Sequence, residues 1–236
     1  MPRNQVKILH KIKLLVSVSN VEEAKIAVEN GADIIDLKNP SAGALGALPI
    51  AVIDEVVAYL HHQEVKQLTS ATIGDIPMSA ICIMPKINSL LATKVDFIKI
   101  GFFESEDYQA TLDMLQEVTQ AGAKLVAVLF AEFSYSDALL AAIHKAGFRG
   151  IMLDTARKNG LSLLDYYTTD ACYTLAKKVK ELGMDFGLAG SIKMENIESL
   201  RFIKPSYMGF RGGICVNHQR NNQLDSEKIS AIRKVL

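Results

Sequence analysis

This 236-residue sequence predicts a single-domain (β/α)8 barrel, the TIM-barrel form of the α/β class. Eight short apolar runs typical of strands recur at fairly regular intervals, and a helical pattern follows each of them. No linker or low-complexity stretch divides the chain. The structural alternative is an open doubly wound sheet, which is disfavoured by the count of eight and by the lack of a Gly-x-Gly-x-x-Gly turn after the first run.

The strand-like runs are short and apolar, as parallel strands are when helices cover the sheet. They are Lys13–Val18, Asp33–Leu37, Leu68–Ile73, Asp96–Ile100, Leu125–Phe130, Gly150–Leu153, Phe186–Ala189 and Tyr207–Phe210. Because side chains alternate along a strand, Ile34, Asp36 and Lys38 are expected on one face of the second run. Ile35 and Leu37 are expected on the other face.

Helical patterns fill the intervals between these runs. They cover Val21–Asn30, Ile50–His62, Ser79–Thr93, Glu106–Ala121, Ser136–Ala146, Leu163–Leu182, Met194–Ile203 and Ser226–Leu236. Residues suited to begin a helix are Asn20, Ser105, Ser136 and Asp225. Glycines that suit the left-handed conformation past a helix end are Gly31, Gly122, Gly147 and Gly183. Pro85 is expected to interrupt the third helix.

Composition excludes several function classes. Lysine plus arginine and aspartate plus glutamate each number 26, so the zero net charge gives no support for nucleic-acid binding. Cys82, Cys172 and Cys215 are far apart and lack metal-ligand spacing, so we expect no disulfide framework, metal or cofactor. No signal peptide and no apolar run near ~20 residues is present, which predicts a cytoplasmic protein without membrane contact. A polar extension over about residues 1–12 precedes the barrel, and homo-oligomerisation is left open.

Charged residues cluster at the predicted strand ends, where barrel enzymes keep their active sites. Asp36 and Lys38 end the second strand, Lys99 ends the fourth, and Asp154 with nearby Lys158 follows the sixth. Lysines meeting carboxylates suit carbonyl chemistry, in which a neutral amine forms a Schiff base and a carboxylate moves protons. Simpler interpretations stay open: an Asp36–Lys38 ion pair at the rim, Lys99 reaching solvent, and Lys158 solvated in a polar loop.

Glycines after the seventh and eighth strands predict a phosphate site. Such barrels often bind phosphate there through free backbone N–H groups. The residues expected to hold it are Gly190, Ser191, Arg211, Gly212 and Gly213. At Gly212 we expect a positive φ and no room for a Cβ beside the anion. Ordinary turn glycines are the alternative, and the glycine-rich segment 39–48 is either a closing loop or a plain connection.

Several of these segments together resemble one family. They are Asp36-Leu-Lys38-Asn-Pro40, Ala71-Thr-Ile-Gly-Asp75, Phe97-Ile-Lys99-Ile-Gly101, Leu153-Asp154-Thr-Ala-Arg-Lys158-Asn-Gly160, Ala189-Gly-Ser-Ile-Lys193 and Arg211-Gly212. In this order they resemble the (5-formylfuran-3-yl)methyl phosphate synthase family, also called 4-(hydroxymethyl)-2-furancarboxaldehyde-phosphate synthase. The resemblance runs from about Leu14 to the carboxyl terminus. It implies a (β/α)8 lyase of methanofuran biosynthesis that joins two glyceraldehyde 3-phosphate molecules.

The resemblance also implies roles for individual residues. Lys38 is the expected Schiff-base lysine, Asp36 and Asp154 the acid/base groups, and Lys99 and Lys158 the activators of carbonyl or phosphate. Arg157 and Asn159, which flank Lys158, and Gly213-Ile214 depart from the family pattern. Two alternatives stay open: another Schiff-base aldolase on the same fold, and a non-catalytic barrel that uses the lysines to bind phosphate.

Overall fold

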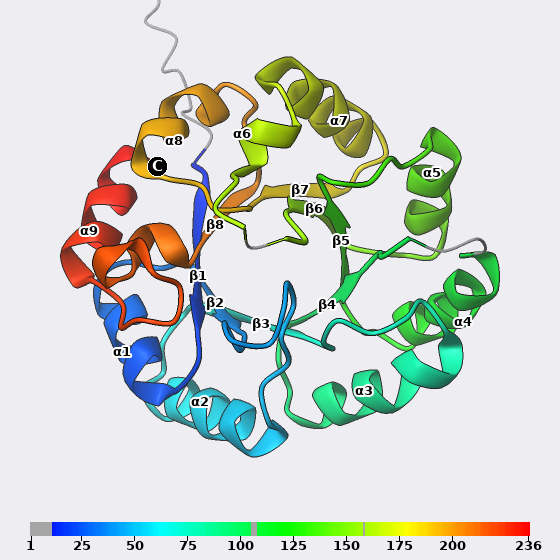
Figure 1. The fold of residues 1–236 in the computed structure, drawn as a ribbon. Coiled ribbons are helices and arrows are strands. Elements are labelled where there is room, and N and C mark those ends of the chain that lie inside the picture. The colour runs from blue at the N-terminus through cyan, green and yellow to red at the C-terminus, as the bar shows by residue number, and fades with distance from the viewer. Residues whose placement is uncertain (1–10, 105–107, 158) are drawn as a thin grey trace, which may run out of the picture.

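The computed structural model describes residues 11–104, 108–157 and 159–236, and it is a closed barrel of eight parallel strands in sequence order. Helices encircle the strands (Figure 1), which confirms the predicted single-domain (β/α)8 barrel. The strands are β1 (Lys13–Val18), β2 (Ile34–Leu37), β3 (Leu68–Thr72), β4 (Phe97–Gly101), β5 (Leu125–Phe130), β6 (Gly150–Asp154), β7 (Asp185–Leu188) and β8 (Tyr207–Phe210). The predicted runs agree with these bounds to within one residue at each end. Nearly all of the predicted extension over about 1–12 lies outside the described residues.

Two apolar layers follow from the alternation along the strands. Ile35 and Leu37 of β2 belong to the large core between the strands and the surrounding helices. Ile34 belongs to a smaller cluster inside the barrel, together with Leu15 and Phe130. The predicted division of β2 into two faces is therefore confirmed, and Asp36 points to the barrel interior.

The helices lie close to their predicted positions, with one exception. They are α1 (Val21–Glu29), α2 (Ile50–His62), α3 (Ala80–Ala92), α4 (Gln109–Gln120), α5 (Asp137–Lys145), α6 (Leu163–Tyr166), α7 (Thr169–Glu181), α8 (Met194–Arg201) and α9 (Ser226–Val235). The single helix predicted over Leu163–Leu182 is wrong, because Tyr167 is extended and separates α6 from α7. The Thr168 hydroxyl then accepts a hydrogen bond from Ala171 N and begins a new helix.

Local signals for helix ends behave as predicted where the structure describes them. The side chains of Asn20, Ser136 and Asp225 accept backbone hydrogen bonds in the first turns of α1, α5 and α9. The four glycines expected past helix ends have positive φ. Ser105, another predicted start, lies outside the described residues. The interruption expected at Pro85 is wrong, because α3 continues through it.

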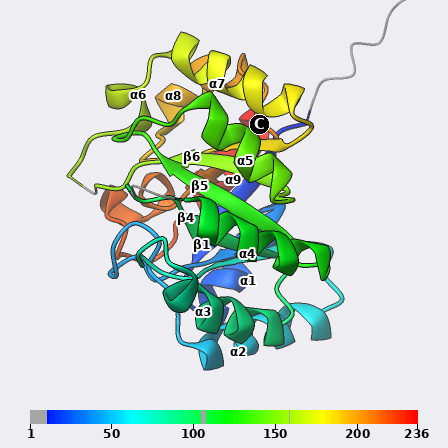
Figure 2. The same ribbon diagram turned by 90° about the vertical axis from the view of Figure 1, so that its right-hand side faces the viewer.

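The loops after the strands gather at one end of the barrel, on the left in Figure 2. After β8 the chain forms two short 3-10 helices, η1 (Gly212–Ile214) and η2 (Val216–His218), which the sequence did not predict. In the described part of the chain, none of the helices has the length and apolar character required to cross a bilayer.

Candidate active site

Asp36 is a buried carboxylate with three side-chain donors. Lys99 Nζ lies 2.6 Å from its Oδ1, and the hydroxyls of Ser70 and Ser17 donate to Oδ1 and Oδ2 at 2.6 and 2.9 Å. Parallel register explains the two serines, since Ser17 and Ser70 are the partners of Asp36 on β1 and β3. Sequence analysis did not single out either serine, although each occupies an inward position near the end of its strand.

These donors set the ionisation of Asp36. Burial alone would raise the pKa of this carboxyl group, because a charge is costly away from water. The ammonium groups of Lys99 and Lys38, with hydrogen bonds from Lys99 and Ser70, outweigh burial and lower the pKa below its ordinary value. Asp36 is therefore a persistent anion at neutral pH.

Lys38 and Asp154 form the second charged pair of the barrel mouth. Lys38 Nζ lies 3.7 Å from Asp154 Oδ2, and Asp154 Oδ1 accepts a hydrogen bond from Thr155 N at 2.7 Å. Both side chains are buried, with relative exposures of 9% for Lys38 and 4% for Asp154. Lys38 comes from the end of β2 and Asp154 from the end of β6, so the pair spans the barrel.

The observed pairs differ from the simple alternatives that the sequence allowed. Asp36 forms its ion pair with Lys99 and not with its near neighbour Lys38, so no Asp36–Lys38 rim pair forms. Lys99 is only 2% exposed and does not reach solvent. Four of the five predicted catalytic side chains thus meet in two buried pairs. The fifth, Lys158, lies outside the described residues.

A cavity of about 280 Å³ opens over these pairs at the carboxyl end of the barrel. Asp36, Lys38, Lys99 and Asp154 line it. All five residues predicted to hold phosphate also line it, namely Gly190, Ser191, Arg211, Gly212 and Gly213. The structure therefore brings four of the five predicted catalytic residues together with all five predicted phosphate-binding residues around one cavity.

Backbone geometry at the cavity rim differs between the glycines. Gly190 and Ser191 have φ of +99° and +50°, so the chain turns sharply after β7. Gly212 does not have the positive φ that we expected, and a Cβ there would lie 3.6 Å from His218 O, an ordinary contact. The tight position is Gly213, where a Cβ would come within 2.6 Å of Ile192 O. The positive φ expected at Gly212 is therefore wrong, and the tight contact with protein backbone lies at Gly213. The close approach of a Cβ at Gly212 to a bound anion stays a prediction.

Free donors line this rim. Within the described part of the chain, the backbone N–H groups of Gly190, Ser191, Ile192, Gly212 and Gly213 donate no hydrogen bond to protein. Gly190, Ser191 and Ile192 follow β7, and Gly212 and Gly213 open η1 after β8. Free N–H groups at such turns are suited to binding an oxyanion.

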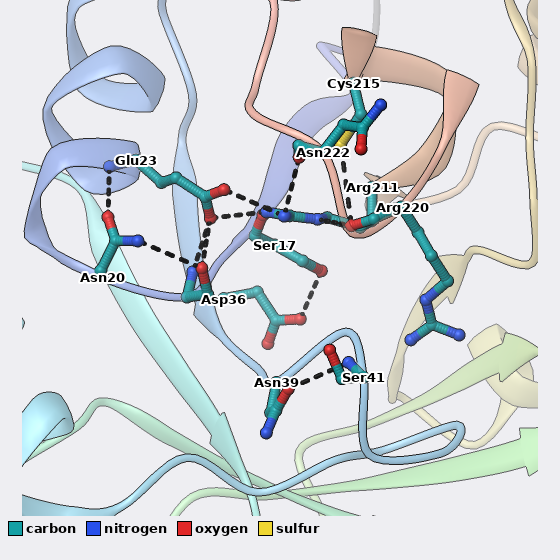
Figure 3. Close-up of polar contacts among 11 residues, drawn as sticks. Ser17, Asn20, Glu23, Asp36, Asn39, Ser41, Arg211, Cys215, Arg220 and Asn222 are labelled. Carbon is teal, nitrogen blue, oxygen red and sulfur yellow. Dashed lines mark hydrogen bonds and ion pairs between the residues drawn. The ribbon is translucent and has the colours of Figure 1, made fainter. Parts of the chain in front are cut away.

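Arg211 lines the cavity, but its guanidinium makes structural contacts. Nη1 and Nη2 donate to the two carboxylate oxygens of Glu23 at 2.6 and 2.9 Å, and further N–H groups donate to the carbonyls of Ser17, Arg220 and Asn222 (Figure 3). This set of contacts fixes the segment after β8 to the start of α1. Glu23 was not identified from the sequence, where it is one of many charged residues on a helix.

The glycine-rich segment 39–48 folds down into the barrel mouth. Leu45 is fully buried in the cluster inside the barrel, and Thr72 Oγ1 donates to its carbonyl at 2.9 Å. The Asp75 carboxylate accepts hydrogen bonds from Ala44 N and Leu45 N at 2.7 and 2.6 Å. The segment is thus anchored to β3 and to the loop that follows it.

A closed (β/α)8 barrel with paired lysines and aspartates in a cavity at its carboxyl end defines an enzyme of the TIM-barrel class. Solved structures share this fold. Phosphoribosyl anthranilate isomerase from Thermus thermophilus matches with a TM-score of 0.64 and 14% identity, over 95% of this chain and 98% of that one. A 3-hexulose-6-phosphate synthase matches with a TM-score of 0.60 and 14% identity, over 93% and 99%.

Sequence relatives identify the family. Residues 14–233 match the family described as 4-HFC-P synthase. The (5-formylfuran-3-yl)methyl phosphate synthase of Methanococcus maripaludis strain C7 is 34% identical, over 94% of this chain and 98% of that protein. The enzyme of the same name from Methanocaldococcus jannaschii is 33% identical with the same coverage. The chain belongs to the 4-HFC-P synthase family, which confirms the resemblance seen in the sequence.

Proposed function

We propose that this enzyme condenses two glyceraldehyde 3-phosphate molecules into (5-formylfuran-3-yl)methyl phosphate through a lysine Schiff base. The observation that carries the proposal is the meeting of two buried lysine–aspartate pairs with a rim of free backbone N–H groups in one cavity. The relatives' name supplies the product. Two trioses contain six carbons and two phosphates, so forming the product releases one phosphate and two waters.

Lys38 is the proposed nucleophile. Its side chain lines the cavity, where a carbonyl carbon can approach the amine, and an imine at this position turns a bound triose into an enamine. The enamine carbon then attacks the second aldehyde in an aldol-type step. Asp154, whose Oδ2 lies 3.7 Å from Lys38 Nζ, is placed to accept and return the protons that imine formation and elimination require.

The Lys99–Asp36 pair assists the Lys38–Asp154 pair. The lowered pKa of Asp36 favours a fixed negative charge, and its 2.6 Å contact holds Lys99 in the cavity as a cation. In this proposal Lys99 activates a carbonyl or phosphate oxygen electrostatically, and Asp36 holds Lys99 in position more than it moves protons. Lys158 keeps its predicted role as a second activator. The Gly190–Ser191 and Gly212–Gly213 turns bind a substrate phosphate through their N–H groups.

Incubation with glyceraldehyde 3-phosphate alone tests the proposed function. We expect furan absorbance to rise while one inorganic phosphate is released for every two trioses consumed. The Lys38→Arg protein is the matched control for uncatalysed phosphate loss. Formation of a simple aldol product would instead show a different Schiff-base aldolase, and phosphate release without a furan would show elimination alone. We expect this enzyme to act in the methanofuran pathway in the cytoplasm. It is expected to need no cofactor and to bind neither nucleic acid nor a membrane.

A further inference from the structure

Arg220 is a cationic residue of the cavity that the reaction scheme above does not use. It follows η2 in the segment after β8, and its side chain lines the cavity. Its own carbonyl accepts a hydrogen bond from Arg211 Nε at 2.7 Å. Since Arg211 also holds Glu23 on α1, the backbone that presents Arg220 is fixed before any ligand binds.

The rest of this segment is also held in place by hydrogen bonds within it. Cys215 and Leu224 form an antiparallel bridge, and Val216 N donates to Gln223 O at 3.0 Å. Asn222 Nδ2 donates to Val216 O at 3.1 Å. A residue at the tip of such a closed segment loses little backbone freedom when it binds a ligand.

The Arg220 guanidinium is only partly satisfied by protein. Figure 3 shows the side chain leaving the Arg211 contacts and extending along the side of the loop that carries Asn39 and Ser41. Nη2 donates to Gly43 O at 3.1 Å. Among the described residues, Nε is buried and has no hydrogen-bond partner. A buried N–H group without a partner is uncommon in native proteins and marks a place for a ligand acceptor.

The surrounding charges leave Arg220 available to an anion. In the described part of the chain no carboxylate oxygen lies within 4.0 Å of it, whereas Lys38, Lys99 and Arg211 each have such a partner. The negative charges of Asp154 and Asp75 are near enough to act on its pKa, although burial has the larger and opposite effect. Its side-chain hydrogen bond is to Gly43 O in the segment 39–48, which Asp75 anchors.

We propose that Arg220 binds the phosphate of the second triose, the one that the N–H groups at Gly190–Ser191 and Gly212–Gly213 do not hold. A guanidinium presents several N–H donors in one plane and can bind two phosphate oxygens at once. This inference rests on the proposed function, because it requires a substrate pair with two phosphates. It gives the cavity two phosphate sites, one made of backbone N–H groups and one made of the Arg220 side chain.

A six-carbon sugar alcohol with a phosphate at each end tests this directly. A hexitol 1,6-bisphosphate has the carbons and phosphates of two trioses but no carbonyl, so it binds without forming an imine. Its affinity is compared with that of a hexitol 6-phosphate by calorimetry. For the unaltered protein we expect the bisphosphate to bind on the order of 10- to 100-fold more tightly, the usual effect of one charge-assisted contact set. Arg220→Gln should abolish that preference, and Arg220→Lys should restore part of it.

Two control variants separate phosphate binding from a merely structural role. Arg201→Gln removes an exposed arginine of α8 and should leave the preference unchanged. Asp75→Ala loosens the same loop that Arg220 contacts at Gly43 but keeps the guanidinium. If the only role of Arg220 were to hold the segment 39–48, Asp75→Ala would also abolish the preference for the bisphosphate. If Arg220 binds phosphate, the preference survives.

The outcomes also separate this inference from the proposed function. A bisphosphate preference that depends on Arg220 supports the second phosphate site even if glyceraldehyde 3-phosphate yields no furan. Furan formation together with an unchanged preference in Arg220→Gln would overturn the site while leaving the proposed function intact. Absence of any preference in the unaltered protein would overturn it as well.

Discussion

The two ends of the barrel carry aspartates only three residues apart, yet their surroundings differ. Asp33 precedes β2 at the amino end, where its Oδ2 accepts a hydrogen bond from Leu14 N at 2.8 Å and pairs with Arg233 of α9. Asp36, inside the same strand, is 1% exposed and pairs with Lys99 beside the cavity. One aspartate joins chain segments to each other, and the other holds a cation that faces the cavity.

Other amino-end aspartates repeat the arrangement of Asp33. Asp96 accepts hydrogen bonds from the backbone N and the hydroxyl of Thr69 at 2.8 and 2.9 Å. Asp185 accepts a hydrogen bond from the Ser206 hydroxyl and pairs with Arg149. Each of these aspartates binds a group on a neighbouring strand or on the turn before it.

This difference teaches that position along the strand, more than residue type, separates stabilising from reactive carboxylates in this fold. At the amino end, aspartates accept hydrogen bonds from backbone N–H groups and pair with arginines that lie outside the cavity. At the carboxyl end, they meet buried lysines in a cavity. Substitutions at the two ends should therefore change different properties of the protein.

Lys38→Arg should produce the largest change. Arginine keeps the positive charge but cannot form an imine, so furan formation should fall to the uncatalysed background. The free energy of unfolding should stay close to that of the unaltered protein, because a cation still faces Asp154. Turnover is measured by furan absorbance and folding by circular dichroism. Near-normal turnover by the folded variant would reject Lys38 as the nucleophile.

Asp154→Asn should lower turnover by ~10²–10⁴-fold, the usual range for a general acid/base group. The amide keeps the size of the side chain but cannot accept the proton that Lys38 chemistry releases. Rates are measured at saturating substrate so that binding does not limit them. A loss below about threefold would assign Asp154 a structural role, since general acid/base groups contribute far more than that.

Gly213→Ala and Gly212→Ala should differ, although they are adjacent. A methyl group at Gly213 would meet Ile192 O and displace the turn that carries the free N–H groups, whereas at Gly212 it has room. Loss of a hydrogen bond to a charged phosphate predicts a rise in KM on the order of tenfold for Gly213→Ala. For Gly212→Ala we expect a smaller rise. Equal, small effects would show that both are ordinary turn glycines.

Asp33→Asn should have the smallest effect on catalysis and a measurable effect on stability. It removes the charge that pairs with Arg233, and we expect a loss of about 1–2 kcal/mol in the free energy of unfolding. Chemical denaturation measures the stability, and kcat/KM should equal that of the unaltered protein. A variant with normal stability but impaired turnover would contradict the division between the two barrel ends.

Much of the fold could be predicted from the sequence because its signals are local. The β2 run contains its own alternation, so the inward direction of Asp36 and the outward direction of Leu37 follow from strand geometry. Asn20 and Asp225 cap helices through contacts within three residues. The break at Tyr167 was missed because Leu163–Leu182 has a continuous helical pattern, and nothing local outweighs it except the capping residue Thr168.

The site could be predicted only as a set of residues, because its pairing depends on the tertiary structure. The Arg211–Glu23 contact joins residues 188 positions apart, and no local pattern connects them. Asp36 pairs with Lys99, and Lys38 pairs with Asp154, because strand register and barrel closure bring these residues together. The burial of Leu45 by the segment 39–48 likewise depends on its contacts with Asp75 and Thr72.

Borohydride trapping with glyceraldehyde 3-phosphate, followed by peptide mass spectrometry, tests the central claim most directly. The claim is that the carboxyl end of the barrel reacts through an imine on Lys38. The expected result is a reduced triose phosphate adduct on the peptide that contains Lys38, absent from the Lys38→Arg protein and retained in Asp33→Asn. An adduct on Lys99 or another lysine, or furan formation without any trapped adduct, would contradict the account.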